Sequence, residues 1–341
     1  MASELDRILV AQLAYIGDMV FTTPLFDAIK QRWPRSRLAV AGLPEALEVL
    51  EDHPAVDLRV PYDKRGEDRG AGGFGRAARA VRSFGPELFI GVTRSARTAM
   101  LALLSGARYR VGFGEPGRRW AYTHAVGRRD EQPFAARSLG LLEPLGGRPG
   151  LRPLHLFVGR RRREMARAAL AGAGWRDEPL LAIAPGSRYV TKRWPERHVG
   201  RLLDIALEAG RLRPALYGGP DERALIERLL TGRPAVLDRR STRVGEMVAE
   251  LSLAAVVLGG DSGPTHIGRA LGVPTVLVLG PTPAGPLEDG RPFARVQRGL
   301  DCQPCSVHGD ESCPLGHHAC LEELPAEEVY RAVVEAHAWL G

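Results

Sequence analysis

Residues 256–282 read VVLGGDSGPTHIGRALGVPTVLVLGPT, and this stretch decides the fold that we expect for the chain. It contains an apolar run up to residue 258, a polar turn at 261–264, a segment of helical character over 265–271 and a second apolar run over 275–279. Strands that are apolar on both faces are typical of a parallel sheet buried between helix layers. The stretch therefore predicts strand, turn, helix and strand in an α/β fold.

The polar turn in this stretch is a candidate phosphate site. Ligands of open parallel sheets bind off the carboxyl ends of strands, where a helix N-terminus presents unpaired N–H groups and a partial positive charge. The turn holds Asp261, Ser262 and Gly263, and Thr265 and His266 follow at once. The alternative is that Asp261 and Ser262 only cap the helix. His266, and a second turn of the same design upstream, favour binding.

Length and charge restrict the class of protein. A chain of 341 residues favours two domains. No apolar run approaches the roughly 18 to 20 residues of a membrane span, and the start MASELDRILV shows no signal-peptide pattern, so we expect a cytoplasmic protein. A net charge of +7 suits anionic substrates, a phospholipid surface or nucleic acid. Basic and aromatic residues do not interleave, so we predict no nucleic-acid partner.

The first half of the chain alternates strand and helix patterns, which predicts a doubly wound sheet. Strands are expected near 7–13, 38–41, 56–60, 88–92 and 108–114, and helices near 19–32, 46–50 and 95–104. The first strand ends in a turn that contains Gly17 and Asp18. Residues 70–75 match the dinucleotide pattern G-x-G-x-x-G, but the charged segment 64–69 separates them from the preceding strand. We therefore expect a mobile loop there.

The second half repeats this architecture after a Gly- and Pro-rich segment at 146–153. Strands are expected at 180–184, 214–217 and 235–237, and helices at 159–171, 198–209, 221–230 and 244–251. We place two Rossmann-like domains at 1–150 and 151–325 and expect them to face a central cleft. The final helix, in 326–341, is predicted to pack back on the first domain.

The second polar turn, residues 184–195, reads APGSRYVTKRWP. It follows a predicted strand and supplies the Ser187 hydroxyl and the cations Arg188 and Lys192. Backbone N–H groups, a hydroxyl and a flexible cation are what a departing diphosphate requires. Lys192 is informative because only Lys30, Lys64 and Lys192 are lysine among 47 basic residues. The alternative is an ordinary surface charge.

Four ordered motifs resemble glycosyltransferase family 9, the ADP-heptose:lipopolysaccharide heptosyltransferases. They are RILVAQLAYIGDMVFTTPLFDAIKQRWP, APGSRYVTKRWPERH, LGGDSGPTHIGRALGVPTVLVLGPT and CPLGHHACLEEL, and the resemblance runs from residue 7 to about 334. The loops 64–79 and 151–163 carry no family signal. The resemblance implies a GT-B fold and an inverting, metal-independent transfer of a heptose from ADP-heptose to the inner core of lipopolysaccharide.

The resemblance also implies roles for single residues. Asp18 matches the general base, which would take the proton of the attacking acceptor hydroxyl. Its alternative role is to cap the helix that follows. Lys192 is expected to offset the charge of the leaving nucleoside diphosphate. The predicted donor-binding residues are Ser187, Arg188, Glu222, Asp261, Ser262, Gly263 and His266, with Glu222 near the adenosine ribose.

An arginine cluster in the first half is a weaker prediction for the acceptor. Arg108, Arg110, Arg118 and Arg119 gather around a glycine-rich loop. Such a cluster can be a solvated surface, or it can receive a phosphorylated lipid A–core acceptor. An acceptor of that kind also implies peripheral contact with the inner face of the inner membrane.

Four cysteines lie close together near the C-terminus, in the order Cys302-x2-Cys305-x7-Cys313-x6-Cys320. With the histidines among them they provide the ligand types of a tetrahedral structural zinc site. Only the first half-site has the short spacing, so free thiols remain the alternative. We expect no cofactor to be required for transfer.

Three other functions remain open from the sequence. A family member could use another nucleotide sugar or acceptor, since motifs for a diphosphate say little about the sugar. A nucleotide-binding module without chemistry is disfavoured by Asp18. A nicotinamide dehydrogenase is disfavoured because the glycine pattern does not follow a strand.

Overall fold

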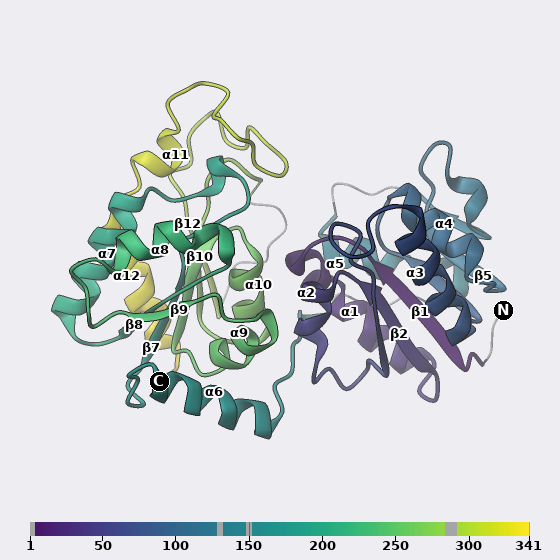
Figure 1. Ribbon diagram of the computed structural model, residues 1–341. Helices are drawn as coiled ribbons and strands as arrows, with labels where there is room; N and C mark the ends of the chain where they lie inside the picture. Colours follow the sequence, from purple (N-terminus) through teal and green to yellow (C-terminus); the bar gives the residue numbers. More distant parts are fainter. Residues whose placement is uncertain (1–3, 128–131, 148–149, 151, 284–291, 341) are drawn as a thin grey trace. The chain divides into compact units, whose positions relative to one another are not determined.

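The computed structural model describes residues 4–127, 132–147, 150, 152–283 and 292–340. The chain divides into two compact units, Met1–Phe157 and Val158–Gly341. Each unit contains one six-stranded sheet with helices on both of its faces (Figure 1). Every strand pairing is parallel. The predicted α/β fold with two doubly wound sheets is confirmed.

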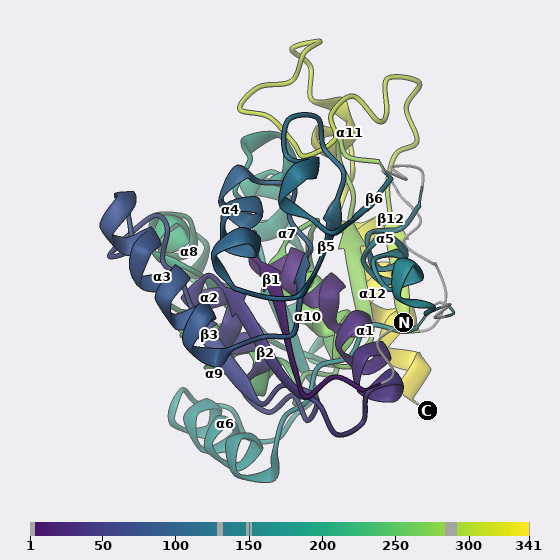
Figure 2. The same ribbon diagram turned by 90° about the vertical axis from the view of Figure 1, so that its right-hand side faces the viewer.

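The sheet of the first unit has the strand order β3-β2-β1-β4-β5-β6. Its strands are β1 (Arg7–Gln12), β2 (Arg37–Gly42), β3 (Leu58–Pro61), β4 (Leu88–Gly91), β5 (Tyr109–Phe113) and β6 (His124–Val126). Its helices are α1 (Ile16–Arg32), α2 (Pro44–Leu47), α3 (Gly70–Phe84), α4 (Ala96–Leu104) and α5 (Phe134–Gly140), with 3₁₀ turns η1 (Glu48–Leu50), η2 (Arg119–Ala121) and η3 (Glu143–Leu145). Helices α3 and α4 lie on one side of β1, and α1 and α5 lie on the other (Figure 2).

The sheet of the second unit has the order β12-β11-β10-β7-β8-β9. Its strands are β7 (Leu180–Ala184), β8 (Arg213–Gly218), β9 (Leu237–Arg240), β10 (Val256–Gly260), β11 (Thr275–Val278) and β12 (Phe293–Val296). Its helices are α6 (Arg160–Gly172), α7 (Glu196–Ala209), α8 (Arg223–Leu230), α9 (Val244–Leu251), α10 (Gly263–Ala270), α11 (Ala319–Glu322) and α12 (Ala326–His337), with η4 (Val190–Lys192), η5 (Pro220–Glu222) and η6 (Ala338–Leu340).

The last long helix, α12, belongs to the second unit. Its buried side chains Val329, Val333 and Ala336 share a core with α7 and with the strands of that unit's sheet. The packing of this segment on the first domain stays a prediction. Among the described residues, no helix combines the length and the apolar character that crossing a bilayer requires.

In each sheet, successive strands are added first toward one edge and then toward the other, so the strand order reverses at one topological switch point. In the first unit this switch lies between β1 and β4, and in the second it lies between β7 and β10. Ligands of open α/β sheets bind outside the carboxyl ends of the strands at such a switch. The polar turns singled out in the sequence follow β1, β7 and β10, so each lies at a switch point.

Helix α3 corrects one prediction from the sequence. Gly70 to Gly75 form the first turns of a 15-residue helix, so the expected loop is wrong. The buried Ala77, Ala78 and Val81 on one face of α3 pack into the core of the first unit. In proteins, packing of an amphipathic face outweighs weak propensity, although each glycine costs about 1 kcal/mol relative to alanine.

Candidate active site

The turn after β10 leads into α10 and contains Ser262, whose hydroxyl group does not cap the helix. Ser262 is the N-cap residue of α10 by backbone conformation, yet its side chain makes no capping bond. The Ser262 Oγ is buried and has no hydrogen-bond partner in the part of the chain that the structure describes. Thr265 Oγ1 donates to the Gly260 carbonyl oxygen at 2.7 Å and fixes the turn. A buried hydroxyl at a helix N-terminus, beside the Gly263 amide, is suited to bind an anion.

Asp261 collects donors from three separate segments. Lys192 Nζ donates to Asp261 Oδ2 at 2.6 Å, and Thr282 Oγ1 donates to the same oxygen at 3.2 Å. His266 Nε2 lies 3.0 Å from Asp261 Oδ1. A carboxylate only accepts hydrogen bonds, so this nitrogen carries the proton. Asp261 thereby orients both the lysine and the histidine.

The surroundings of Asp261 favour its ionised form. Burial by itself raises the pKa of this carboxyl, but His266 and Lys192 together hold the pKa well below its usual range. The Lys192 side chain is 12% exposed and that of His266 is 6% exposed. Asp261 is therefore ionised at neutral pH, and the ammonium of Lys192 keeps two N–H donors for a ligand.

The loop after β7 brings Lys192 to this turn, because β7 and β10 are neighbours in the sheet. Ser187 is buried, and its carbonyl oxygen accepts a hydrogen bond from Arg193 Nε at 2.7 Å. Arg188 is exposed, and its guanidinium lies 5.8 Å from the centre of the Tyr189 ring. The backbone of the loop is thus fixed, while Arg188 extends from it toward solvent.

Glu222 lies over the start of the same loop. Its Oε2 accepts the Gly219 N–H at 2.8 Å in a capping box of η5. A Cβ added at Gly186 would lie 2.2 Å from Glu222 Cγ, so any larger residue at position 186 would displace the Glu222 side chain. The structure thus brings Glu222 to the β7 loop that carries Ser187 and Lys192.

In the first unit, Asp18 lies inside α1 and not in a turn before it. The helix begins at Ile16, and Asp18 Oδ2 accepts the Tyr15 N–H at 3.0 Å. The buried Gln12 side chain donates to Thr22 Oγ1 at 2.9 Å, and Thr22 Oγ1 donates to the Asp18 carbonyl oxygen at 2.7 Å. These bonds fix the first turn. The capping role of Asp18 is therefore present, and the residue is half-buried.

Lys64 is a further residue of this region that sequence reasoning passed over. Burial, followed by the charges of Arg65 and Arg97, lowers the pKa of Lys64, while Asp18 and Glu45 oppose the shift. Lys64 Nζ also donates to the Leu13 carbonyl oxygen at the end of β1. The rarity of lysine, which drew attention to Lys192, applied equally to Lys64.

The four predicted acceptor arginines are engaged to different degrees. Arg110 donates to the carbonyl oxygens of Ala121 and Ala107, at 2.9 and 3.0 Å. Its guanidinium therefore stabilises the loop that follows β5. Arg118 donates to the Arg94 carbonyl oxygen. Arg108 and Arg119 are exposed. An acceptor role stays a prediction for all four.

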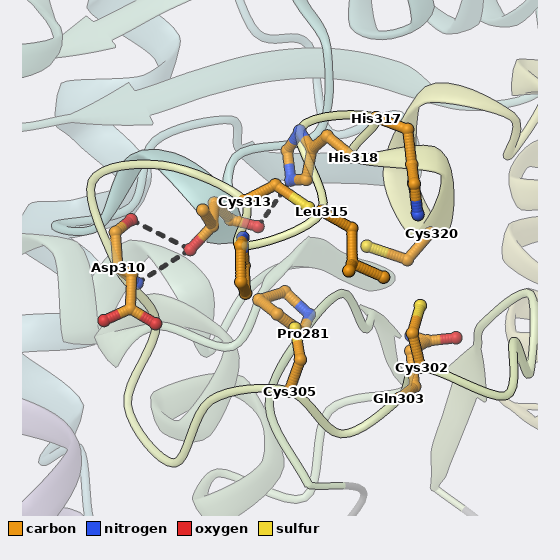
Figure 3. A pocket seen from close by; sticks show the side chains of 12 residues that line it. Pro281, Cys302, Gln303, Cys305, Asp310, Cys313, Leu315, His317, His318 and Cys320 are labelled. Atoms are coloured by element: carbon orange, nitrogen blue, oxygen red, sulfur yellow. Dashed lines mark hydrogen bonds between the residues drawn. The ribbon is translucent and has the colours of Figure 1, made fainter.

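The four cysteines of the predicted zinc site line one cavity, together with Leu315, His317 and His318 (Figure 3). All four are free thiols. Within the described ranges, no three His, Cys, Asp or Glu side chains are arranged so that they could hold a metal ion as they stand.

Comparison with known proteins identifies the family to which this chain belongs. Residues 75–313 match the family model described as glycosyltransferase family 9 (heptosyltransferase). Lipopolysaccharide heptosyltransferase 3 of Escherichia coli K12 is 24% identical over 79% of this chain and 81% of its own. Lipopolysaccharide heptosyltransferase 1 of Pseudomonas aeruginosa PAO1 is 27% identical over 88% of this chain and 86% of its own.

Solved structures share the architecture across the whole chain. The glycosyl transferase family 9 protein of Veillonella parvula DSM 2008 aligns with a TM-score of 0.85 and 21% identity, covering 98% of both chains. E. coli ADP-heptose lps heptosyltransferase II aligns at 0.81 and 18%, covering 98% of this chain and 99% of that one. The iron-containing dodecameric glycosyltransferase TibC of enterotoxigenic E. coli H10407 aligns at 0.60 and 16%, covering 99% and 78%.

These two sheets thus form the α/β fold of the GT-B heptosyltransferases. The chain belongs to glycosyltransferase family 9, the heptosyltransferase family.

Proposed function

We propose that this protein transfers a heptose from ADP-heptose to the inner core of lipopolysaccharide, with inversion at the anomeric carbon. The observation that carries the proposal is the cluster at the ends of β7 and β10. There Lys192 and His266 contact Asp261 at the N-terminus of α10, beside the Ser262 hydroxyl, which has no hydrogen-bond partner among the described residues. Similar proteins include an ADP-heptose lps heptosyltransferase.

In the proposed reaction, the acceptor hydroxyl oxygen attacks the anomeric carbon from the face opposite the diphosphate. The bond between that carbon and the diphosphate oxygen breaks, and ADP leaves with the bonding electrons. Asp18 accepts the proton of the hydroxyl as the new bond forms. The sugar configuration is inverted because attack and departure take place on opposite faces.

The donor side of the reaction needs positive charge at the departing diphosphate. Lys192 offers two N–H donors that Asp261 does not use, and the N-terminus of α10 adds a partial positive charge. Ser187, Arg188, Ser262 and the Gly263 amide provide further donors, and Glu222 is assigned to the ribose hydroxyls. We propose that these groups offset the charge and that no metal ion takes part in transfer.

The acceptor of this reaction is a phosphorylated lipid, so we propose peripheral contact of the protein with the inner membrane. Helix α4 and η2 pack together in the first unit and expose Met100 (41%), Leu104 (40%) and Trp120 (64%). Arg97 and Arg119 lie on the same two elements and are exposed. Apolar side chains with tryptophan and arginine are suited to an anionic headgroup layer. This set of five residues is called the α4–η2 patch below.

The proposal is tested by incubating the purified protein with ADP-heptose and a heptose-deficient core acceptor. We expect ADP release and one added heptose on the acceptor, in equal amounts, with mass spectrometry as the readout. Transfer from another nucleotide sugar, with none from ADP-heptose, would identify a different donor. Tight ADP binding with no transfer to any core acceptor would favour a binding module.

A further inference from the structure

The cysteine segment, residues 302–320, is joined directly to the loop that carries Lys192. The Thr191 N–H donates to the Asp310 carbonyl oxygen at 3.1 Å, and the Asp310 N–H donates to Thr191 Oγ1 at 2.8 Å. His318 Nε2 donates to the Thr191 carbonyl oxygen at 2.7 Å. Thr191, the residue before the proposed catalytic lysine, is thus held by three hydrogen bonds to Asp310 and His318 of this segment.

The segment also lies against the lysine side chain itself. Gly309 has φ +89°, and a Cβ added there would lie 2.6 Å from Lys192 Cδ. The backbone at Gly309 therefore packs on the aliphatic part of the Lys192 side chain. A shift of the segment would change where that ammonium points.

On its other side the segment reaches the chain just before Thr282. The Cys305 N–H donates to the Pro281 carbonyl oxygen at 3.0 Å, and Gln303 Nε2 donates to the Gly280 carbonyl oxygen at 2.6 Å. Thr282 is the residue that donates to Asp261. The cysteine segment therefore contacts the chain next to Lys192 and next to Thr282, the two residues that donate to Asp261 Oδ2.

Little apolar burial holds this segment in place. Residues 302–318 contain no helix or strand, and Val307 and Leu315 are 71% and 61% exposed. The four cysteines of the segment line a common cavity, although Cys305 is itself exposed. Figure 3 shows the sulfurs of Cys302, Cys305 and Cys320 directed into one cavity, which Cys313 also lines. Short irregular segments that lack an apolar core are commonly stabilised by a metal ion.

We propose that Cys302, Cys305, Cys313 and Cys320 bind one tetrahedral metal ion of the zinc type, and that this ion fixes the segment against the Lys192 loop. Four thiolates form a donor set that zinc accepts in structural sites, and iron accepts the same set. Binding of M²⁺ releases the four thiol protons and requires the side chains to turn toward one centre. The ion makes no contact with substrate.

The metal site is tested on the full chain by elemental analysis after purification without a metal-affinity step. We expect about one zinc or iron ion per chain, the analysis distinguishing the two, and thiols that react with a disulfide reagent only as the metal is released. Cys302→Ser with Cys305→Ser should abolish binding. Metal-free protein that shows four reactive thiols and takes up no zinc or cobalt on dialysis would overturn the site.

The supporting role of the ion rests on the proposed function, and it is measured separately through ADP binding. Removing the metal from the wild-type chain with a chelator should weaken ADP binding about tenfold or more, and adding the metal back should restore it. This comparison avoids a variant that fails to fold. An ion that binds stoichiometrically but leaves ADP affinity unchanged would contradict the supporting role, whereas failure of transfer alone would bear only on the proposed function.

Discussion

At Asp18, helix capping and proton transfer can be separated by one substitution. Asp18→Asn keeps a side-chain oxygen that can accept the Tyr15 N–H but removes the base. We expect the transfer rate to fall by about 10²-fold or more, the contribution typical of a positioned base. ADP affinity, measured by calorimetry, and the melting temperature should stay near wild type. If ADP affinity falls as far as the rate does, Asp18 is not the base.

Lys192 should act mainly in the transition state, where the diphosphate gains negative charge. We expect Lys192→Ala to lose about 2 to 4 kcal/mol of transition-state stabilisation, measured as the change in kcat/KM. Lys30→Ala is a matched control, because Lys30 pairs with Asp57 and donates to the Ser36 carbonyl oxygen just before β2, at the opposite end of the strands from the switch point of its own unit. A Lys192→Ala rate within a factor of about two of wild type would end the assignment.

The low pKa of Asp261 makes a prediction about stability and pH. Because the folded pKa is depressed, the ionised carboxylate stabilises the fold above the unfolded pKa of about 4, and this stabilisation is lost as pH falls through the folded value. Asp261→Asn should therefore be less stable than wild type at pH 7. In urea unfolding the difference should shrink below about pH 4. A difference that does not change with pH would show that ionisation is not its cause.

At the scale of elements, the sequence predicts the chain best where packing and turn chemistry agree. Strands β7 and β10 are apolar throughout and end in polar turns, and α9 has the predicted bounds Val244–Leu251. Helix α3 was missed because its first residues are glycines, and only tertiary packing of its other face makes it a helix. The edge strands β6 and β12 were missed because they are short and only partly buried.

The ion pair between β9 and α9 predicts a large cost for one substitution. Arg239 Nε donates to Glu250 Oε2 at 2.9 Å, and the Glu250 side chain is 1% exposed. Arg239→Ala leaves a buried carboxylate without a counter-ion, so we expect a loss of about 3 to 5 kcal/mol in the free energy of unfolding. Chemical denaturation measures this loss.

The control for this substitution is a surface pair of the same residue types. Arg160 and Glu164 form an i, i+4 pair on α6 with side chains 93% and 63% exposed. Exposed pairs contribute about 0 to 1 kcal/mol, so Arg160→Ala should change stability little. Equal losses in the free energy of unfolding for Arg239→Ala and Arg160→Ala would mean that burial does not determine how much an ion pair contributes to stability.

At the scale of the whole molecule, the sequence supplies the parts of the site but not their pairings. Lys192 and Asp261 are 69 residues apart and meet because β7 and β10 are neighbours in the sheet. No local sequence pattern indicates that β10 lies next to β7 in the sheet, because strand order is set by tertiary packing. The proximity of Lys64 to Asp18 has the same origin, since β1, β2 and β3 adjoin in the sheet.

The α4–η2 patch allows the membrane proposal to be tested with the intact protein. We expect the wild type to sediment with vesicles that contain anionic phospholipid, and to do so less as salt is raised, because arginine contacts are screened. Met100→Glu with Trp120→Glu should reduce the bound fraction about tenfold or more, since the changes place charge where apolar side chains would enter the headgroup layer.

Met165→Glu is the matched control for the patch, because Met165 is 60% exposed on α6 in the second unit. It changes the net charge by the same amount per substitution without touching the patch, so it should bind vesicles like wild type. Transfer to a short, water-soluble core acceptor should be unchanged in the patch variant, which separates membrane contact from chemistry. Equal vesicle binding by the patch variant and the control would show that another surface meets the membrane, whereas weaker binding by the patch variant alone identifies α4 and η2 as the contact.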